Sequence, residues 1–181
     1  MPTRTVKPYR VPLLLSLTLG VAIVALNVER EIVNIMAVFA GSIIGTFTLD
    51  LDYIVHAFFI EPEKQESLVL RDYVQHKDIK GLLNYISYHE SEFEEKTLNS
   101  ALFQVVLGAA TIFVITSTIG LIIKAFVLST FLNSIYRFLK AFMHDKTDDW
   151  FWSLKIDTTP LNVYLFLLVL LATFAYTLYL F

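Results

Sequence analysis

The stretch that decides the fold is GSIIGTFTLDLDYIVH, residues 41–56. Its first half is apolar and carries Gly41 and Gly45 four residues apart, which places them on one face of a helix. Its second half carries Asp50 and Asp52, followed by a histidine. Small residues at this spacing let two helices approach closely in a membrane, and polar residues in such helices usually face the bundle interior. The stretch therefore predicts a membrane helix whose packing face leads into a polar site.

The composition of the whole chain agrees with a membrane protein. The 181 residues are 56% hydrophobic, and the mean hydropathy is +0.61, which is too apolar for an ordinary soluble domain. The chain has no cysteine, which excludes disulfides and zinc–thiolate sites. The net charge of −3 gives no indication of nucleic-acid binding. The lipid bilayer is thus the first partner that the sequence predicts.

Five segments are predicted as membrane helices, since a span needs about 20 mostly apolar residues. In order they are 11–27, 32–60, 98–117, 119–143 and 161–181. A polar segment, 61–97, separates the second span from the third. The predicted fold is all-α: a polytopic bundle of five transmembrane helices with a cytoplasmic amphipathic helical insert, forming one integral membrane domain over residues 1–181.

Lysine and arginine set the expected orientation. If the N-terminus lies in the cytoplasm, all of the 14 basic residues except Arg30 and Lys124 fall on the cytoplasmic side. This bias follows the positive-inside rule and places the C-terminus outside the cell inner (plasma) membrane. The aromatic run DDWFW at 148–152 is typical of an anchor at the membrane interface.

The polar insert is predicted to be helical. Ile79, Leu82, Leu83 and Ile86 follow the spacing of an amphipathic helix, and Asp78 precedes them as a plausible N-cap. An interfacial helix that closes the bundle from the cytoplasmic side explains this pattern. A lid over a site in the inner leaflet is the alternative.

Polar residues of three predicted spans reach a common depth. Asp50 lies about 18 residues, or about 27 Å, from the outer start of the second span, close to the inner boundary. The third span begins at that boundary and the fourth ends there. Because unpaired polar groups in hydrocarbon cost several kcal/mol each, we expect them to form one connected cluster. Its predicted members are Asp50, Asp52, Asn99, Gln104, Asn133 and Arg137.

The two aspartates cannot share one site on a regular helix. Asp50 and Asp52 diverge by about 200° on an ideal helix. Both serve one site only if the helix is broken between them, or if they contact different neighbours. Asp52 and His56, four residues apart, can share a ligand without distortion.

Three segments, LDLDYIVH, EEKTLNSALF and FLNSIYRF, resemble in order and helical context the motifs of the YdjM-like family of inner-membrane proteins. The resemblance covers roughly residues 40 to 140 and implies a helical membrane fold with a metal-dependent hydrolase site. Asp50, Asp52 and Ser100 match the family pattern. Histidines of the pattern are replaced by Glu94, Asn99 and Asn133, and an aspartate is replaced by Arg137. The LDLDY and WFW signatures also resemble small uncharacterised membrane proteins of reduced-genome bacteria.

A divalent metal would need three or four nitrogen or oxygen ligands and an open position for water. The residues that could supply ligands are Asp50, Asp52, His56, His89 and Glu94. Glu90 is the candidate catalytic base. Arg137, a permanent cation at the same depth, would repel a metal but bind a carboxylate. No cofactor is therefore favoured, and we expect Arg137 to pair with an aspartate.

Three classes of function remain open at this point. The favoured one is a non-catalytic bundle, descended from such a hydrolase fold, that acts as an assembly or scaffold partner for a second copy or another membrane protein. The second is a membrane-embedded hydrolase of a lipid or headgroup at the cytoplasmic leaflet. The third is a small transporter or proton path that uses Asp50, Asp52 and His56. No Ser-His-Asp pattern, P-loop or dinucleotide motif points to another chemistry.

Overall fold

The computed structural model describes residues 9–27, 30–89, 97–154 and 158–181. These residues form helices and no strand, as predicted. The helices are α1 (Arg10–Leu26), α2 (Ile32–Thr48), α3 (Leu51–Val55), the π-helix η1 (His56–Ile60), α4 (Gln65–Gln75), α5 (Ile79–His89), α6 (Ala101–Thr116), α7 (Leu121–Met143), α8 (Asp148–Phe151) and α9 (Pro160–Leu180). A helix therefore stands at each of the five predicted span positions.

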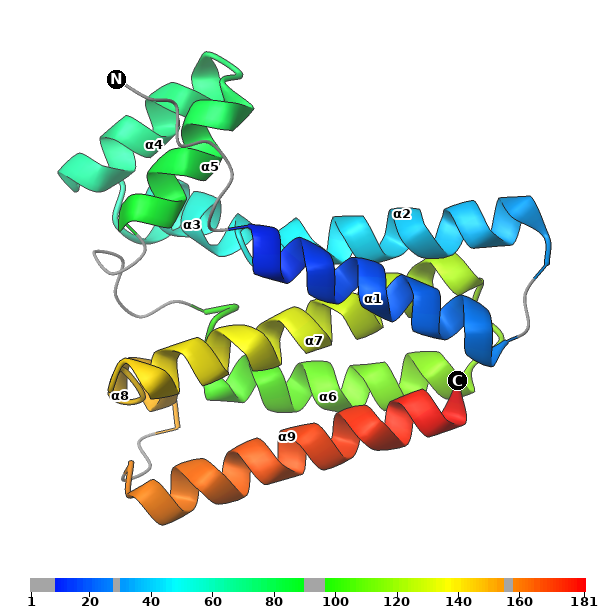
Figure 1. Ribbon diagram of the computed structural model, residues 1–181. Helices are drawn as coiled ribbons and strands as arrows, with labels where there is room; N and C mark the ends of the chain where they lie inside the picture. The colour runs from blue at the N-terminus through cyan, green and yellow to red at the C-terminus, as the bar shows by residue number, and fades with distance from the viewer. Residues whose placement is uncertain (1–8, 28–29, 90–96, 155–157) are drawn as a thin grey trace.

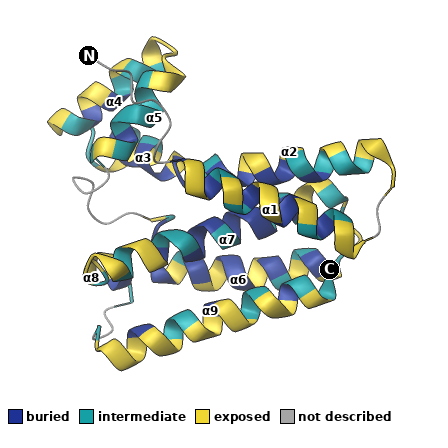
Figure 2. Cartoon of the chain, in the orientation of Figure 1, coloured by how far each residue is buried: buried dark blue, intermediate teal, exposed yellow. Residues whose placement is uncertain are grey.

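The five long helices lie side by side, with α7 at the centre of the bundle. Helix α7 packs against α1, α2, α6 and α9 (Figure 1). Helices α3, α4, α5 and α8 lie at one end of the bundle, and the C-terminus lies at the other. Figure 2 shows that α7 is buried along much of its length, whereas α9 exposes most of its surface. The exposed side chains of α9 are largely apolar, which suits contact with lipid.

The glycine face of α2 packs against the backbone of α7, as the sequence predicts. A Cβ atom built on Gly41 would lie 2.2 Å from the carbonyl oxygen of Ile122, and one on Gly45 would lie 2.6 Å from that of Phe126. Both distances are shorter than any real contact of this kind, so a side chain at either position would push the helices apart. This close approach packs α2 against the N-terminal half of α7.

The second predicted span is bent rather than continuous. Its two parts, 32–48 and 51–60, meet at an angle of 43°. At the break the amide of Asp50 bonds to Phe47 three residues back, and the carbonyl of Leu49 accepts a hydrogen bond from the side chain of Asn99. A tertiary partner therefore takes the place of the regular helical bond, and the helix changes direction between the two aspartates.

Among the described residues, α7 and α9 are long and apolar enough to cross a membrane. The bent pair of α2 with α3 and η1 is a third candidate. Helices α1 and α6, with 17 and 16 residues, are apolar but shorter than 18 residues. The structure thus supports a helical protein with membrane-crossing helices.

The polar insert contains two helices, α4 and α5. Asp78 accepts a hydrogen bond from the amide of Gly81 at 2.9 Å, which is the expected N-cap contact. The apolar sides of α4 and α5 pack on α3 and η1 around a small core that contains Tyr53, Leu70 and Ile86. The insert is therefore a packed helical unit attached to the end of α2.

The aromatic run at 148–152 does not form a simple surface anchor. Trp150 and Phe151 are buried, and their rings pack against Phe138 of α7 in tilted and edge-to-face arrangements. The indole of Trp150 also donates a hydrogen bond to Gln104. Of the three aromatic residues of the run, only Trp152 keeps substantial exposure. The interpretation of this run as an interfacial anchor was wrong for Trp150, because α8 folds back against α6 and α7, where Gln104 of α6 offers a buried polar partner.

Candidate functional site

An ion pair lies where the end of α2 meets the C-terminal half of α7. Nη2 of Arg137 lies 2.6 Å from Oδ1 of Asp50, and the two side chains are only 12% and 8% exposed. Nη1 of Arg137 donates to the amide oxygen of Asn99 at 3.2 Å. The guanidinium therefore bridges the α2–α3 junction and the segment that precedes α6. A charge-assisted contact this short is among the stronger polar interactions in a protein.

The second aspartate holds the backbone that leads into α6. Oxygens of Asp52 accept hydrogen bonds from the amides of Thr97, Leu98 and Asn99 at 3.1, 2.9 and 3.0 Å. They accept a fourth bond, at 2.9 Å, from the side-chain amide of Asn99. Asp52 is 1% exposed. Its charge lies near the N-terminus of a helix, where the macrodipole favours an anion.

Asn99 joins the two aspartates into one group. Its side chain accepts from Arg137 and donates to Asp52 and to the carbonyl of Leu49. We call Asp50, Asp52, Asn99 and Arg137 the Asp50–Arg137 cluster. The bend between α2 and α3 lets both aspartates contribute, one toward α7 and the other toward α6. The sequence left open a break in the helix or contacts with different neighbours, and the structure has both.

Two other expected members of the cluster bind elsewhere. Gln104 donates to the carbonyl of Ser134 and accepts from Trp150. Asn133 donates to the hydroxyl of Ser16 at 2.9 Å and to the carbonyl of Ser129. The expectation of a single six-residue cluster is therefore wrong for these two side chains. Gln104 and Asn133 lie about one turn deeper in the bundle than the start of α6 and Arg137, and a count of depth alone ignores which neighbour each helix face meets.

A buried serine group in the bundle interior was missed from the sequence. The hydroxyl of Ser16 contacts that of Ser129 at 2.9 Å and accepts from Thr46 at 2.7 Å. With Asn133, these residues connect α1, α2 and α7. The signal was present, because Ser16 interrupts the apolar run of the first span, and a polar group there needs a partner.

The candidate metal ligands that the structure describes do not gather into one site. Asp50 pairs with Arg137, and Asp52 binds the backbone amides before α6. Nε2 of His56 contacts Oε2 of Glu61 at 2.8 Å. The ring of His89 stacks on Tyr85 with the centroids 4.3 Å apart. Within the part of the chain that the structure describes, no three His, Asp or Glu side chains gather as a metal site. The described donors thus do not fit a three-ligand centre. Glu90 and Glu94 lie outside the described residues.

Glu61 links the π-helix to the insert. The ammonium of Lys64 lies 2.7 Å from the same carboxylate oxygen that contacts His56. This hydrogen bond from Lys64 holds the pKa of Glu61 below its ordinary value, and the contact with His56 acts in the same direction. Glu61 is therefore an ionised partner for His56 near neutral pH, which gives the histidine a local structural role.

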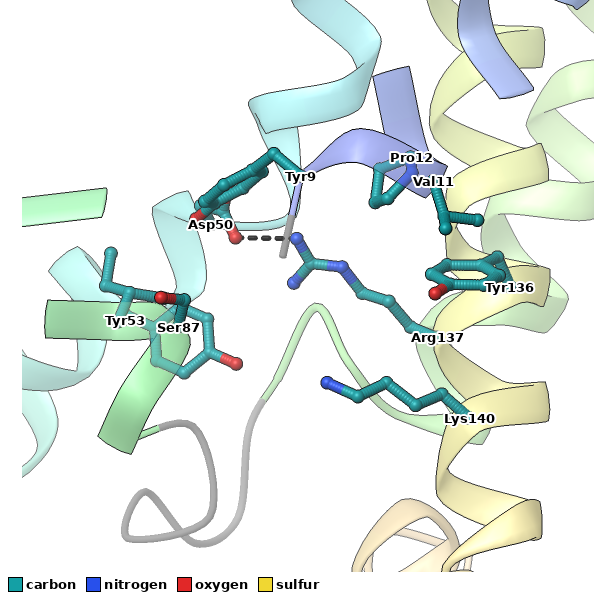
Figure 3. Close-up of a pocket in the computed structure, with 10 residues that line it drawn as sticks. Tyr9, Val11, Pro12, Asp50, Tyr53, Ser87, Tyr136, Arg137 and Lys140 are labelled. Atoms are coloured by element: carbon teal, nitrogen blue, oxygen red, sulfur yellow. Dashed lines mark hydrogen bonds and ion pairs between the residues drawn. The ribbon is translucent and has the colours of Figure 1, made fainter. Parts of the chain in front are cut away.

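A cavity of about 290 Å³ adjoins the Asp50–Arg137 cluster. Its walls come from the start of α1, the α2–α3 junction, α5 and the C-terminal end of α7. Figure 3 shows Arg137 and Lys140 extending from α7 into this space, with Tyr136 beside them and Ser87 of α5 across from them. We call this space the α5 cavity. The insert therefore covers a cavity at the end of the bundle.

No family model matches this chain, and no curated protein or solved structure matches it either. The geometry of the site therefore carries the functional argument.

Proposed function

We propose that the chain is an integral membrane protein that crosses the bilayer five times, with its N-terminus in the cytoplasm and its C-terminus outside. The bundle of five apolar helices and the distribution of basic residues support this arrangement. Helices α1 and α6 are about 24–26 Å long, which is short for the hydrocarbon core, so polar ends of these spans would lie near the headgroups. The insert and α8 would then lie on the cytoplasmic side.

A reporter fused after Phe181 tests this topology. A reporter that is active only outside the cytoplasm is expected to be active there, and one that fluoresces only in the cytoplasm is expected to stay dark. Fusions in the turn between α4 and α5 should give the opposite result. A cytoplasmic C-terminus would refute the five-span arrangement.

Within this topology we propose a non-catalytic role, as an assembly or scaffold partner in the bacterial inner membrane. The observation that carries the proposal is the use of both aspartates in structural contacts, one with Arg137 and the other with the backbone before α6. A metal-dependent hydrolase would need these carboxylates for its ion. The resemblance to the YdjM-like family then reflects a divergent member in which a guanidinium occupies the place of the metal.

An assembly role is supported by the shape of the insert. Helices α3, α4 and α5 extend beyond the bundle at one end (Figure 1). Phe59 of the adjoining η1 is 81% exposed, and Ile79 and Tyr88 of α5 are 68% and 69% exposed. Large apolar side chains that remain exposed beside a membrane are suited to contact with another protein or a second copy.

Elemental analysis of the purified chain tests the non-catalytic role. We expect no stoichiometric zinc or manganese in the wild type. The decisive comparison is Asp52→Asn with Asp72→Asn, because Asp72 is an exposed aspartate outside the cluster. Stoichiometric metal that is lost in Asp52→Asn and retained in Asp72→Asn, with both variants folded, would overturn the proposal and favour the hydrolase.

A further inference from the structure

Residues 51–60, which form α3 and η1, bury their polar side chains and expose apolar ones. Asp52 and His56 are buried against the rest of the chain. The side chains of this segment that stay exposed are all apolar: Leu51, Val55, Phe59 and Ile60. A helix that lies on the surface of a soluble protein shows the opposite pattern, with its charged and polar residues outward. The exposed side of α3 and η1 therefore suits an apolar medium rather than water.

We propose that this side lies in the cytoplasmic leaflet, at the boundary between acyl chains and headgroups, and anchors the insert to the membrane. We call its four exposed residues, Leu51, Val55, Phe59 and Ile60, the α3–η1 face. The proposal rests on the topology proposed above, in which α2 crosses the bilayer. It goes beyond that topology because it assigns a lipid partner to the surface that follows the bend.

The α3–η1 face continues the exposed apolar side of α2. Ile44 of α2 is exposed, and Leu51, Val55 and Phe59 follow it at intervals of seven, four and four residues. These intervals are typical of residues on one side of a helix. In the proposed topology the exposed apolar side of α2 faces acyl chains, so the same kind of surface runs past the bend onto α3 and η1.

The bend keeps the segment within the depth of the headgroups. Its ten residues are at most about 15 Å long, and at 43° to a vertical α2 they advance about 11 Å toward the cytoplasm. Asp50 lies about 27 Å from the outer start of the span, so about 10 Å remain to the cytoplasmic edge of a bilayer about 40–45 Å thick with its headgroups. The segment therefore ends close to the surface of the membrane.

The exposed residues become polar directly after η1, at this calculated edge. Glu61 and Lys64 form an ion pair in which both side chains are partly exposed. Helix α4 then exposes polar residues such as Asp72 and Gln75 beside its exposed apolar ones. Exposed charged groups need water, so the change between Ile60 and Glu61 marks the limit of the lipid. A protein partner on the α3–η1 face gives no reason for this change to fall at the depth of the headgroups.

This anchor also narrows the surface that is open to a protein partner. Phe59 contacts lipid in this arrangement. Of the exposed apolar residues considered for assembly, Ile79 and Tyr88 of α5 then remain. The scaffold role would therefore use α5, while α3 and η1 hold the insert at the membrane.

Single cysteine variants test this placement, because the chain has no cysteine of its own. A nitroxide label would be attached in Val55→Cys and in Phe59→Cys, both at exposed positions of the α3–η1 face. Ile44→Cys on α2 is the lipid control, and Gln75→Cys at the end of α4 is the water control. Circular dichroism would confirm that each variant keeps its helices.

The full chain would be reconstituted in vesicles of phosphatidylglycerol and phosphatidylethanolamine. Electron paramagnetic resonance would measure how often each label collides with oxygen, which concentrates in lipid, and with a nickel chelate, which stays in water. We expect the ratio of oxygen to nickel collisions to fall in the order Ile44, Val55, Phe59, Gln75. The ratio at Val55 should be several-fold higher than that at Gln75.

Three results would overturn the proposal. Ratios at Val55 and Phe59 as low as that at Gln75 would place the α3–η1 face in water. Weak collision with both reagents at these two positions would show that protein covers the face, and would assign it to a partner or a second copy. A low ratio at Ile44 as well would refute the crossing of α2, so a failure of the topology is distinguishable from a failure of the anchor alone.

Discussion

Replacing Arg137 by alanine is expected to lower the free energy of unfolding by about 3–5 kcal/mol, the range seen when one partner of a buried ion pair is removed. The variant leaves Asp50 as a buried charge without its cation, and Asn99 loses a donor. The low exposure of both charged side chains is the reason to expect the buried range rather than that of a surface pair. Unfolding by sodium dodecyl sulfate in detergent micelles would measure the change.

A double replacement distinguishes an ion pair from simple loss of packing. In Asp50→Leu with Arg137→Leu no buried charge is left, so part of the lost stability should return. Arg10→Ala serves as a control, since Arg10 is exposed at the start of α1, and it should change stability by less than about 0.5 kcal/mol. If the double variant is as unstable as Arg137→Ala, the pair does not account for the effect.

The ion pair and the helix positions could be predicted from the sequence because both rest on one-dimensional quantities. The lengths of the apolar segments located the helices. The number of residues from the end of each span then placed Asp50, Asn99 and Arg137 at the same depth. Charge then selected the partner of Arg137, since few acids lie at that level. The glycine spacing of α2 likewise needed only the period of a helix to predict a close neighbour.

The parts that sequence reasoning missed depend on direction around each helix and on folding back of the chain. Asn133 lies one turn from Arg137, but its bonds go to Ser16 and Ser129. Trp150 became a core residue because a short helix returns beneath the bundle. Neither the order of helices around α7 nor the path of α8 is encoded in hydropathy, so these contacts became visible only in three dimensions.

The bend of the second span shows how a tertiary contact decides local structure. Residues 32–60 read as one apolar helix, and no proline or glycine marks the point at which it turns. The carbonyl of Leu49 is bound by Asn99, which is fifty residues away in sequence. With that partner the helix ends and restarts, and Asp52 turns toward α6. The same contact therefore explains why the helix breaks and how both aspartates join one cluster.

Replacing Asp52 by alanine is expected to be the second strongly destabilising change, with a loss of about 3 kcal/mol or more. The side chain is the acceptor for three backbone amides and for the amide of Asn99. Alanine would leave these donors without their carboxylate acceptor, and each buried unsatisfied donor costs about 1–3 kcal/mol. Thr97 is exposed and can bond to water instead, so the cost falls mainly on Leu98 and Asn99.

In Asp52→Ala the start of α6 is expected to open before the whole protein unfolds. Hydrogen exchange at the amides of Leu98 and Asn99 is expected to accelerate in Asp52→Ala under conditions in which the middle of α7 stays protected, because the start of α6 would open first. Asp52→Asn keeps one acceptor oxygen and should show a smaller change in both measurements. Asp72→Ala, at an aspartate whose side chain is 67% exposed, is the control and should match the wild type. If Asp52→Ala leaves these two amides protected and is as stable as Asp72→Ala, then Asp52 does not anchor α6, and its carboxylate would again be available for chemistry.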